Sequence, residues 1–385
     1  MALGAGEIMR VLHVLEATAG GAAKHVVDLC EGLAKRGVEV HLVYSPLRMD
    51  DIFKKGVEKL REAGVKLSRF PMRREPHISD VGALLYLRRY VIDHGPFLLI
   101  HAHSSKAGGL ARLLRILGGP LVVYTPHAFA TLSKNFGKLA YLMYEVAERF
   151  LASFTSVVIV GSAYEAREAQ RLGYQRVAIV HQGINMTEPL LGGRDDIRQE
   201  WGIGADAVVI GSVGRLAPEK APWVLVDAFQ RVSTKHPAAL LVLVGNGPLE
   251  KRLLEMIKEK GLLERVLMPG FMEGRRAMRG FDIFALASEY ESFGYVLVEA
   301  MAEGLPIVST KVGIAEEILT EGENGFLVPT GDVEAFAQAF DKLLSDEALR
   351  RRMGESSRTF VKNLSVDKMI EAILDVYEEV ARDAL

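Results

Sequence analysis

Short runs of Val, Ile and Leu alternate with longer helical patterns along this chain, and the alternation occurs in two successive halves. Runs that are apolar at nearly every position are typical of strands buried on both faces of a parallel sheet. The pattern therefore predicts two successive α/β units facing each other across a cleft. The expected strands of the first unit are Arg10–Leu15, Val40–Tyr44, Leu98–His101, Leu121–Tyr124, Val157–Val160 and Val177–Val180. Those of the second are Val208–Val213, Leu240–Val244, Val266–Met268, Ile283–Leu286 and Ile307–Ser309.

A Pro/Gly-rich turn without periodicity, Asn185–Gly193, separates the two halves. A chain of 385 residues is also long for a single hydrophobic core. We therefore expect one domain over residues 1–187, a second over residues 188–365, and a final helix within residues 366–385.

Composition limits the class of protein and its partners. The single cysteine, Cys30, rules out an internal disulfide and indicates a reducing cytoplasm. No apolar run approaches the roughly 20 residues that cross a bilayer. The first residues lack a signal peptide's apolar stretch, and Met9 is a candidate natural start.

Charge is divided unevenly between the halves. Residues 1–187 contain 24 Lys and Arg against 16 Asp and Glu, whereas the remainder contains 23 against 33. The basic first half is expected to face an anionic partner. No recognition motif supports nucleic acid.

The segment from Glu291 to Pro306 has the strongest functional pattern. It follows an apolar strand and reads as a short loop and a buried helix, which Gly304 and Pro306 end. Ser292 is expected to cap this helix, and Gly294 lets the backbone approach a ligand. Glu299 lies within the apolar helix, where a carboxylate is costly unless it is hydrogen-bonded.

Glu291, Glu299 and a helix N-terminus are thus predicted to converge at the carboxyl end of a strand, where α/β sheets bind ligands and where phosphate is attracted. Carboxylates suit sugar hydroxyls, so one site could hold both sugar and phosphate. The simpler interpretation is a capped core helix in which Glu299 pairs with a basic residue.

Cations and glycines follow other strands. Arg215 and Lys220 lie in a turn after Val208–Val213, where a guanidinium and an ammonium suit phosphate oxygens. Gly20 and Gly21 lie in a loop, Ala17–Ala22, that leads into the first helix, expected at Ala23–Arg36, and they let a phosphate or sugar approach; a plain tight turn is equally consistent with them. Gly247 follows another strand, but Glu250 stands where a dinucleotide fingerprint has its third glycine.

Histidines follow two strands of the first half. His127 lies just past a strand end, where an imidazole can hydrogen-bond a sugar hydroxyl or serve structure alone. His101 and His103 suggest a metal site, but we expect their side chains to point to opposite sides, and no third ligand is suitably spaced. The chain contains no Asp-x-Asp pair, so no metal-held diphosphate is expected.

A basic run surrounds a helix that also has apolar residues. It extends from Lys54 to Arg74 and includes Ile52, Phe53, Val57 and Leu60. A solvated surface is the simpler interpretation, and docking on anionic lipid headgroups is the alternative.

Together these residues resemble the large family of retaining, nucleotide-sugar-dependent glycosyltransferases with the GT-B fold, in which two Rossmann-like domains face each other. The strongest similarity is the pair Glu291 and Glu299 with Ser-Phe-Gly after the first. His103-Ser-Ser-Lys-Ala-Gly and Thr125-Pro-His-Ala-Phe129 are most similar to members that build exopolysaccharide. The chain departs from the usual pattern at Ala221, where the family has Gly after Lys220, and at His181–Asn185, which replaces Pro-Asn-Gly-Val-Asp.

The resemblance implies roles for individual residues. Glu291 would meet the donor sugar and Glu299 the ribose, while Arg215 and Lys220 would hold the diphosphate. His127 would lie near the donor sugar, and the final helix would cross back to the first domain. The remaining donor-binding candidates are Gly20, Gly21, Gly247, Gly270, Phe271, Ser292, Phe293 and Gly294.

The function that the resemblance implies is glycosyl transfer from a nucleoside diphosphate sugar, with a UDP-sugar as the preferred donor. The reaction would retain the anomeric configuration and would need no metal or other cofactor. The acceptor would be a glycan, a lipid-linked sugar or a small molecule. Front-face attack would need no protein nucleophile, and the cations would replace a metal. The alternatives are a nucleotide-sugar epimerase, a sugar phosphorylase, or a non-catalytic nucleotide-sugar-binding protein. A cytoplasmic location is expected, and peripheral contact at the inner face of the cell membrane is the alternative left open.

Overall fold

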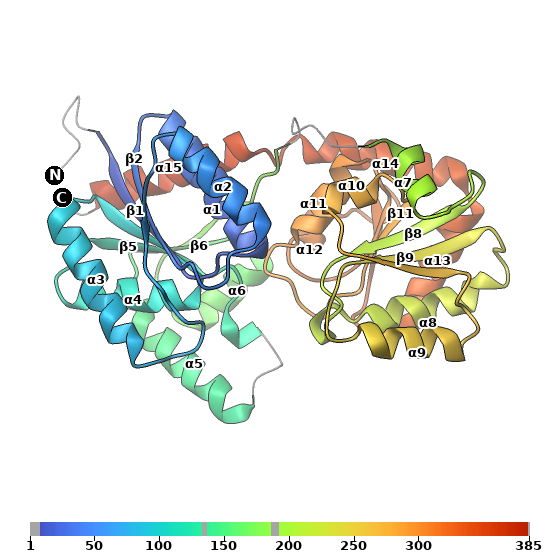
Figure 1. Ribbon diagram of the computed structural model, residues 1–385, viewed down its shortest axis with the longest axis horizontal. Helices are drawn as coiled ribbons and strands as arrows, with labels where there is room; N and C mark the ends of the chain where they lie inside the picture. The colour runs from blue at the N-terminus through green and yellow to red at the C-terminus, as the bar shows by residue number, and fades with distance from the viewer. Residues whose placement is uncertain (1–7, 133–136, 186–191, 384–385) are drawn as a thin grey trace. The chain divides into compact units, whose positions relative to one another are not determined.

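Figure 1 shows the computed structural model, which describes residues 8–132, 137–185 and 192–383. The chain divides into two compact units. Unit 1 contains residues 1–183 and 366–385, and unit 2 contains residues 184–365. Most of the turn expected to link two domains, at Asn185–Gly193, lies outside the described residues.

Unit 1 is built on a parallel sheet with the strand order β3-β2-β1-β4-β5-β6-β7. Strands β1 and β4 are central, and the chain adds strands outward on both sides of this pair, which makes it a topological switch point. The strands are β1 (Arg10–Leu15), β2 (Glu39–Tyr44), β3 (Lys66–Arg69), β4 (Leu99–His103), β5 (Leu121–Thr125), β6 (Val157–Val160) and β7 (Val177–Ile179). The edge strand β3 was not among the expected strands.

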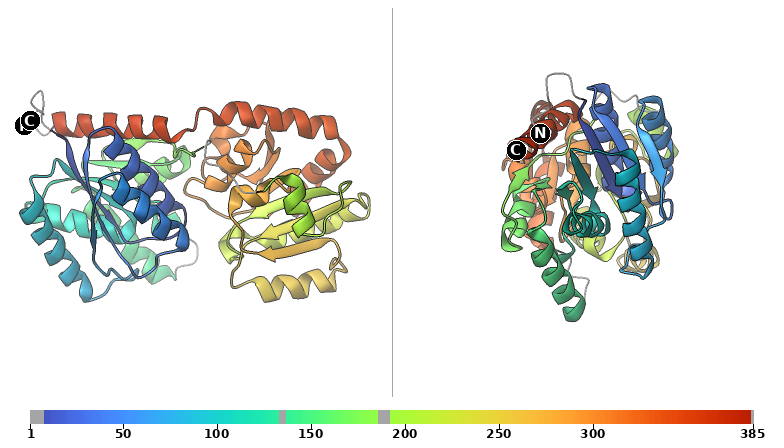
Figure 2. Two further views of the ribbon diagram at one scale, coloured as in Figure 1. Left: turned by 45° about the horizontal axis from the view of Figure 1, so that its top comes forward. Right: turned by 90° about the vertical axis from the view of Figure 1, so that its left-hand side faces the viewer.

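Helices cover both faces of this sheet (Figures 1 and 2). One buried cluster joins the strands to α1, α2 and α15, and another joins them to α3 and α4. The helices of the unit are α1 (Gly20–Lys35), α2 (Asp51–Glu62), α3 (Ser79–His94), α4 (Ser104–Ile116), α5 (Lys138–Ala152), α6 (Ala163–Arg171) and α15 (Val366–Arg382), with a 3-10 turn at Ala130–Leu132.

The last helix of the chain, α15, packs within unit 1 against α1. A Cβ on Gly32 of α1 would lie 1.9 Å from the Ile370 side chain, so the absence of a side chain permits the close approach. Tyr377 is fully buried, and its hydroxyl lies 2.6 Å from His101 Nδ1. The final helix has the bounds expected from the sequence, and unit 1 is therefore assembled from both ends of the chain.

Unit 2 repeats the scheme with the strand order β10-β9-β8-β11-β12-β13. Its strands are β8 (Val208–Val213), β9 (Ala239–Val244), β10 (Val266–Gly270), β11 (Ile283–Leu286), β12 (Ile307–Thr310) and β13 (Gly325–Val328). Its helices are α7 (Arg194–Glu200), α8 (Pro222–Ser233), α9 (Glu250–Glu259), α10 (Gly274–Met278), α11 (Tyr295–Ala302), α12 (Ala315–Ile318), α13 (Val333–Ser345) and α14 (Glu347–Val361), with a 3-10 turn at Pro218–Lys220. Apolar cores lie on both faces of the sheet, and β8 with β11 forms its switch point.

Candidate functional site

The switch point of unit 2 collects the charged residues singled out in the sequence. Arg215 and Lys220 follow β8, and Glu291 follows the neighbouring strand β11. The loops are tied together, because the Glu289 N–H donates to the Glu219 carbonyl at 2.8 Å. Ligands of open α/β sheets bind at this position, outside the carboxyl ends of the strands.

Lys220 and Glu291 form an ion pair. Lys220 Nζ lies 2.5 Å from Glu291 Oε1, and the Ser288 hydroxyl donates to the same oxygen at 2.7 Å. Both charged side chains are largely buried, with 28% and 12% exposed. Arg215 is 66% exposed, and its nearest carboxylate oxygen belongs to Glu219 at 3.7 Å. Arg215 and Lys220 both border a small hollow of unit 2 with a volume of about 20 Å³, enough for about one water molecule.

The loop between β11 and α11 differs from the expectation in one respect. Gly294, with φ of 94°, is the N-cap of α11. The N-cap residue is therefore Gly294, in a left-handed turn, and not Ser292, which lies two residues earlier. Gly304, with φ of 73°, follows the end of the helix as predicted.

Ser288 and Gly313 also support the loop between β11 and α11, and neither was identified from the sequence. The Phe293 carbonyl accepts from the Ile314 N–H at 2.9 Å, and Phe293 itself is buried. A Cβ on Gly313 would lie 2.4 Å from the Phe293 oxygen. Gly313 therefore lets the two loops meet, and Ser288 orients Glu291.

Glu299 is 8% exposed within α11, as its place in an apolar helix predicted. Its Oε2 atom lies 3.1 Å from the position of a Cβ on Gly274, the first residue of α10. A larger residue at position 274 would press on this carboxylate, which therefore lies close to the start of α10.

Three of the donor-binding candidates lie at the carboxyl ends of β9 and β10. A Cβ on Gly247 would lie 2.2 Å from the Leu216 carbonyl, so this glycine allows the loop after β9 to pack on the Arg215 loop. Gly270 has φ of 84°, and the next residue, Phe271, is 73% exposed. The exposed ring follows the edge strand β10 and offers a stacking surface.

Ala221 replaces the usual glycine after Lys220 but keeps a glycine-like backbone. It has φ of 43° and ψ of 47°, and it is the N-cap of α8, whose first residue is Pro222. A left-handed conformation costs a non-glycine residue roughly 1–2 kcal/mol. The departure therefore stores strain next to Lys220 and leaves the start of the helix intact.

In unit 1 the glycines lie inside the helix and not in a loop before it. Helix α1 begins at Gly20, three residues earlier than expected, and Gly21 is exposed in its first turn. The Gly20 N–H donates to the Asp50 carboxylate at 2.9 Å. Space is open around Gly20, where a Cβ would meet nothing within 4 Å.

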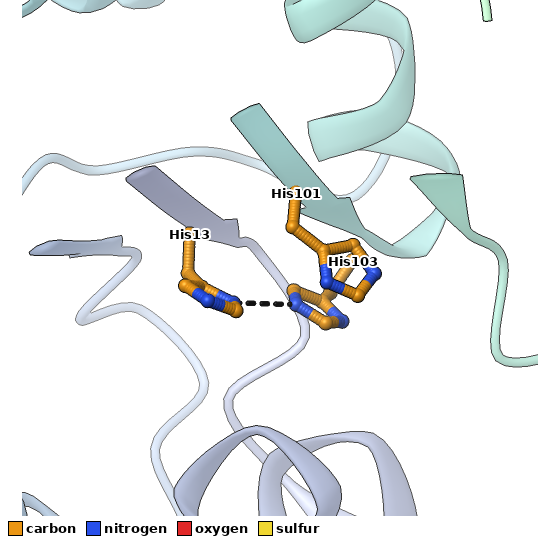
Figure 3. A group of neighbouring side chains, drawn as sticks. All are labelled: His13, His101 and His103. Carbon is orange, nitrogen blue, oxygen red and sulfur yellow. Dashed lines mark hydrogen bonds between the residues drawn. The ribbon is translucent and has the colours of Figure 1, made fainter. Parts of the chain in front are cut away.

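His127 belongs to a cluster of histidines at the switch point of unit 1. His13 of β1 and His101 and His103 of β4 have ring nitrogens within 4.8 Å of one another (Figure 3). The expectation that His101 and His103 point to opposite sides was wrong, since residues i and i+2 of a strand share one face. Their ring centroids are only 4.1 Å apart.

Hydrogen bonds link the cluster to His127. His13 Nδ1 lies 3.1 Å from His103 Nε2, and His103 Nδ1 lies 3.2 Å from His127 Nε2. Burial lowers the pKa of His13 to about 3 and the pKa of His103 and His127 well below the ordinary value. The imidazoles are therefore neutral at pH 7. His25 of α1 completes the group and was not identified from the sequence, because its helix carries it to a cluster formed by distant strands.

The chain is similar to known proteins over both units. The family model for glycosyl transferases group 1 matches residues 193–360, and the glycosyl transferase 4-like domain matches residues 20–183. The chain is 30% identical to D-inositol 3-phosphate glycosyltransferase of Saccharomonospora viridis, over 74% of this chain and 71% of that protein. It is 27% identical to the putative glycosyltransferase EpsD of Bacillus subtilis, over 84% of this chain and 87% of that protein.

A solved structure shares the fold. The crystal structure of Anabaena Alr3699/HepE in complex with UDP superposes with a TM-score of 0.80 and 22% identity, over 96% of this chain and all of that chain. The predicted α/β fold class, with two Rossmann-like domains of the GT-B type, is confirmed. With both of its units matched, the chain belongs to the glycosyl transferases group 1 family.

Proposed function

We propose that this glycosyltransferase moves a sugar from a nucleoside diphosphate sugar, with UDP as the carrier, to a glycan, lipid-linked or small-molecule acceptor with retention at the anomeric carbon. The observation that carries the proposal is the meeting of Arg215, Lys220 and Glu291 at the switch point of unit 2. UDP is favoured because HepE, which shares the fold, was crystallised with UDP and with UDP-glucose.

The site suits a departing diphosphate. Breaking the bond to the sugar builds negative charge on the leaving oxygen, which preorganised cations and amides stabilise. An ammonium about 4 Å from a phosphate charge contributes roughly 4 kcal/mol at an effective dielectric constant of about 20. Arg215 is free to swing because it is exposed, and the backbone at Ser292–Gly294 lies beside the start of α11.

The Lys220–Glu291 pair serves as the resting state of this site. When Lys220 turns toward phosphate, Glu291 is released to accept hydrogen bonds from sugar hydroxyls, while Ser288 still holds it. Glu291 Oε1 is shared by two donors, which fits a sugar-binding group better than a nucleophile. We therefore assign the acceptor's proton to the leaving phosphate oxygen, as in front-face attack, and no step to a metal.

The proposal is tested by donor binding and turnover in three variants. Lys220→Ala and Glu291→Gln should each lower kcat about 10²- to 10³-fold, the usual effect of losing one such charge or donor. Arg231→Ala is the matched control, because Arg231 is an exposed cation of unit 2 paired with Glu334. NMR of the first-formed product should show the donor's anomeric configuration, and EDTA should leave the rate unchanged. Equal rates in all three variants would reject the site.

The same assays separate the alternatives. Epimerisation of a UDP-sugar without acceptor would indicate an epimerase, and cleavage of a glycan that requires phosphate would indicate a phosphorylase. Tight donor binding without turnover across a panel of acceptors would indicate a binding protein.

For the membrane contact expected from the sequence, the structure favours α5 over α2. Phe53, Val57 and Leu60 of α2 are buried in the core, so the basic run around them lacks an apolar face. Helix α5 instead exposes apolar residues at helical spacing, each more than half exposed: Leu139, Leu142, Met143, Val146 and Phe150. No helix in the described part of the chain is long and apolar enough to cross a bilayer.

We propose that this face of α5 lies on an anionic lipid surface from the cytoplasmic side. Exposed Lys138 lies at the start of this face and suits anionic headgroups, whereas Arg149 near its other end is already paired with Glu145 at 3.0 Å. Vesicles containing anionic lipid should sediment the wild type, and Leu142→Gln with Val146→Gln should abolish this. Leu254→Gln with Leu263→Gln, which alters equally exposed leucines of unit 2, should not. Sedimentation unaffected by the α5 changes would exclude this surface.

A further inference from the structure

Three histidines of unit 1 come together from three different elements. His25 lies on α1, His103 ends β4, and His127 follows β5. A ring nitrogen of each lies within 4.8 Å of the others. We propose that His25, His103 and His127 form a binding site for a divalent transition-metal ion such as Zn²⁺ or Co²⁺.

The spacing is close to that of bound imidazoles. His103 Nδ1 and His127 Nε2 are 3.2 Å apart. Two nitrogens at about 2.0–2.1 Å from a tetrahedral Zn²⁺ lie about 3.3 Å from each other. An ion can therefore replace the hydrogen bond between these rings with little movement, and only the His25 side chain must approach.

The strongest evidence for a bound ion is the burial of His25 without hydrogen-bond partners in the described part of the chain. His25 is 3% exposed, and neither of its ring nitrogens has a hydrogen-bond partner among the residues that the structure describes. Buried polar atoms without partners are rare, and an ion or water commonly explains them. Its ring meets that of His127 edge-on at 4.9 Å between centroids.

The surroundings meet two further requirements of a metal site. Ligands must be unprotonated, and burial lowers the pKa of His25 to about 4 while the pKa of His103 and His127 falls well below the ordinary value. A ligand histidine is usually oriented by a partner on its other nitrogen, and His103 Nε2 lies 3.1 Å from His13 Nδ1.

The neighbouring group of His13, His101 and His103 is less suited. Both ring nitrogens of His101 already have partners, the Tyr377 hydroxyl at 2.6 Å and the Thr125 hydroxyl at 2.8 Å. A metal there would break one of these bonds at a fully buried position. His127 is only half-buried, which gives the first group an entry path.

The ligand set decides the ion and leaves an open position. Three imidazoles without a carboxylate suit Zn²⁺, Co²⁺, Ni²⁺ or Cu²⁺ and not Mg²⁺ or Ca²⁺. The fourth position is free for water. The site does not depend on the proposed diphosphate site, whose cations lie in unit 2.

The test is Co²⁺ binding by the full chain, purified without a histidine tag and treated with EDTA. We expect one equivalent per chain, with the intense visible d–d absorption of a four-coordinate ion, and displacement by Zn²⁺. His25→Gln should weaken binding at least 10-fold by titration calorimetry. His77→Gln, which alters an exposed histidine of the same unit, should bind as the wild type does.

His13→Gln distinguishes the two groups. It should weaken binding about 10-fold and retain the four-coordinate spectrum, since it removes only the partner of a ligand. Loss of binding in His13→Gln with unchanged binding in His25→Gln would place the ion in the other group and overturn the proposal. Weak binding with an octahedral spectrum, equal in every variant, would overturn it as well. Circular dichroism and urea unfolding verify that each variant is folded, and His127→Gln serves if His25→Gln is not.

Discussion

Replacing Gly313 by Ala should displace the neighbouring loop between β11 and α11, which carries Glu291, and should therefore lower both stability and activity. A Cβ at position 313 would lie 2.4 Å from the Phe293 carbonyl oxygen and 2.9 Å from Glu291 Cβ. Such contacts do not occur below 3.0 Å, so the loop that carries Glu291 must move by at least about 0.6 Å. The obstacle is backbone and the first atom of a side chain, neither of which can rotate away.

Two terms contribute to the loss of stability. Gly313 has φ of 56°, and this left-handed conformation costs alanine roughly 1–2 kcal/mol. Overpacking of a tight contact costs about 1–3 kcal/mol. Together the free energy of unfolding should fall by about 2–5 kcal/mol, measured by urea denaturation.

Activity should fall only because of the collision with the Glu291 loop, and not because of the left-handed conformation at position 313. A misplacement of about 1 Å can cost a reaction on the order of 10²-fold, so a shift of about 0.6 Å should lower kcat roughly 10-fold or more. Gly322→Ala is the matched control, because Gly322 has φ of 76° with nothing within 4 Å of the added Cβ. It carries the conformational cost without the collision.

The comparison of the two variants decides the matter. Gly322→Ala should lose about 1–2 kcal/mol and keep its turnover of donor sugar. If Gly313→Ala retained the same kcat and the same stability as Gly322→Ala, the contact between the two loops would not position Glu291.

Three other predictions concern stability. Arg112→Ala should lower the free energy of unfolding by about 3–5 kcal/mol, because it leaves the buried Glu148 without the guanidinium that lies 2.8 Å away. The double change Arg112→Met with Glu148→Leu leaves no buried charge and should cost far less, which urea denaturation of the two variants would show. Hydrogen bonds from Lys66, His41 and Arg10 lower the pKa of Glu39 to about 2 from an ordinary 4.5, so its stabilisation is present above about pH 4.5 and lost as pH falls toward 2. Glu39→Gln should therefore be less stable than the wild type at pH 7 and approach it near pH 2 in denaturant titrations. Ala221→Gly should raise the free energy of unfolding by about 0.5–1 kcal/mol, because relief of the left-handed strain exceeds the entropy that glycine adds to the unfolded chain. An unchanged or lower free energy of unfolding would show that the strain is absent.

Most of the sheet strands could be predicted because burial on both faces leaves a continuous apolar run. The two that escaped prediction, β3 and β13, lie at sheet edges. Strand β3 is Lys-Leu-Ser-Arg, exposed or half-exposed throughout, and such a segment has no apolar pattern to recognise. Charged residues on an edge strand discourage pairing with another chain, so the feature that hides β3 in the sequence also protects the sheet.

The site could be predicted only as far as strand ends could be located. Arg215, Lys220 and Glu291 were placed at such ends, and the order of the strands then makes their loops neighbours. The pairing of Lys220 with Glu291 and the support from Ser288 and Gly313 depend on distances across loops, which no local pattern encodes. The N-cap at Gly294 instead of Ser292 escaped prediction for the same reason, since it depends on the left-handed conformation of Gly294.

The histidine cluster shows a different kind of limit. The spacing of His101 and His103 does place both rings on one face of β4, so the sequence contained this relation although the prediction reversed it. The contributions of His13 and His25 require the pairing of β1 with β4 and the packing of α1 on the sheet. A site formed by residues 13, 25, 103 and 127 becomes visible only after the fold is known.

Backbone strain in this protein is concentrated at the ends of the switch-point strands and their neighbours. Among the described residues, the non-glycine positions with positive φ are Ser104, His127, Ala128 and Ala221. The first follows β4, the next two follow β5, and the last precedes the helix after β8. Each costs of order 1–3 kcal/mol, so together they amount to a large share of the 5–15 kcal/mol by which a domain is stable. Such conformations persist only where surrounding contacts fix them, and here they adjoin the histidine cluster in one unit and Lys220 in the other. The two sheets therefore sustain strained loops at the positions where imidazoles and cations are presented, which is a physical reason to look for chemistry at both.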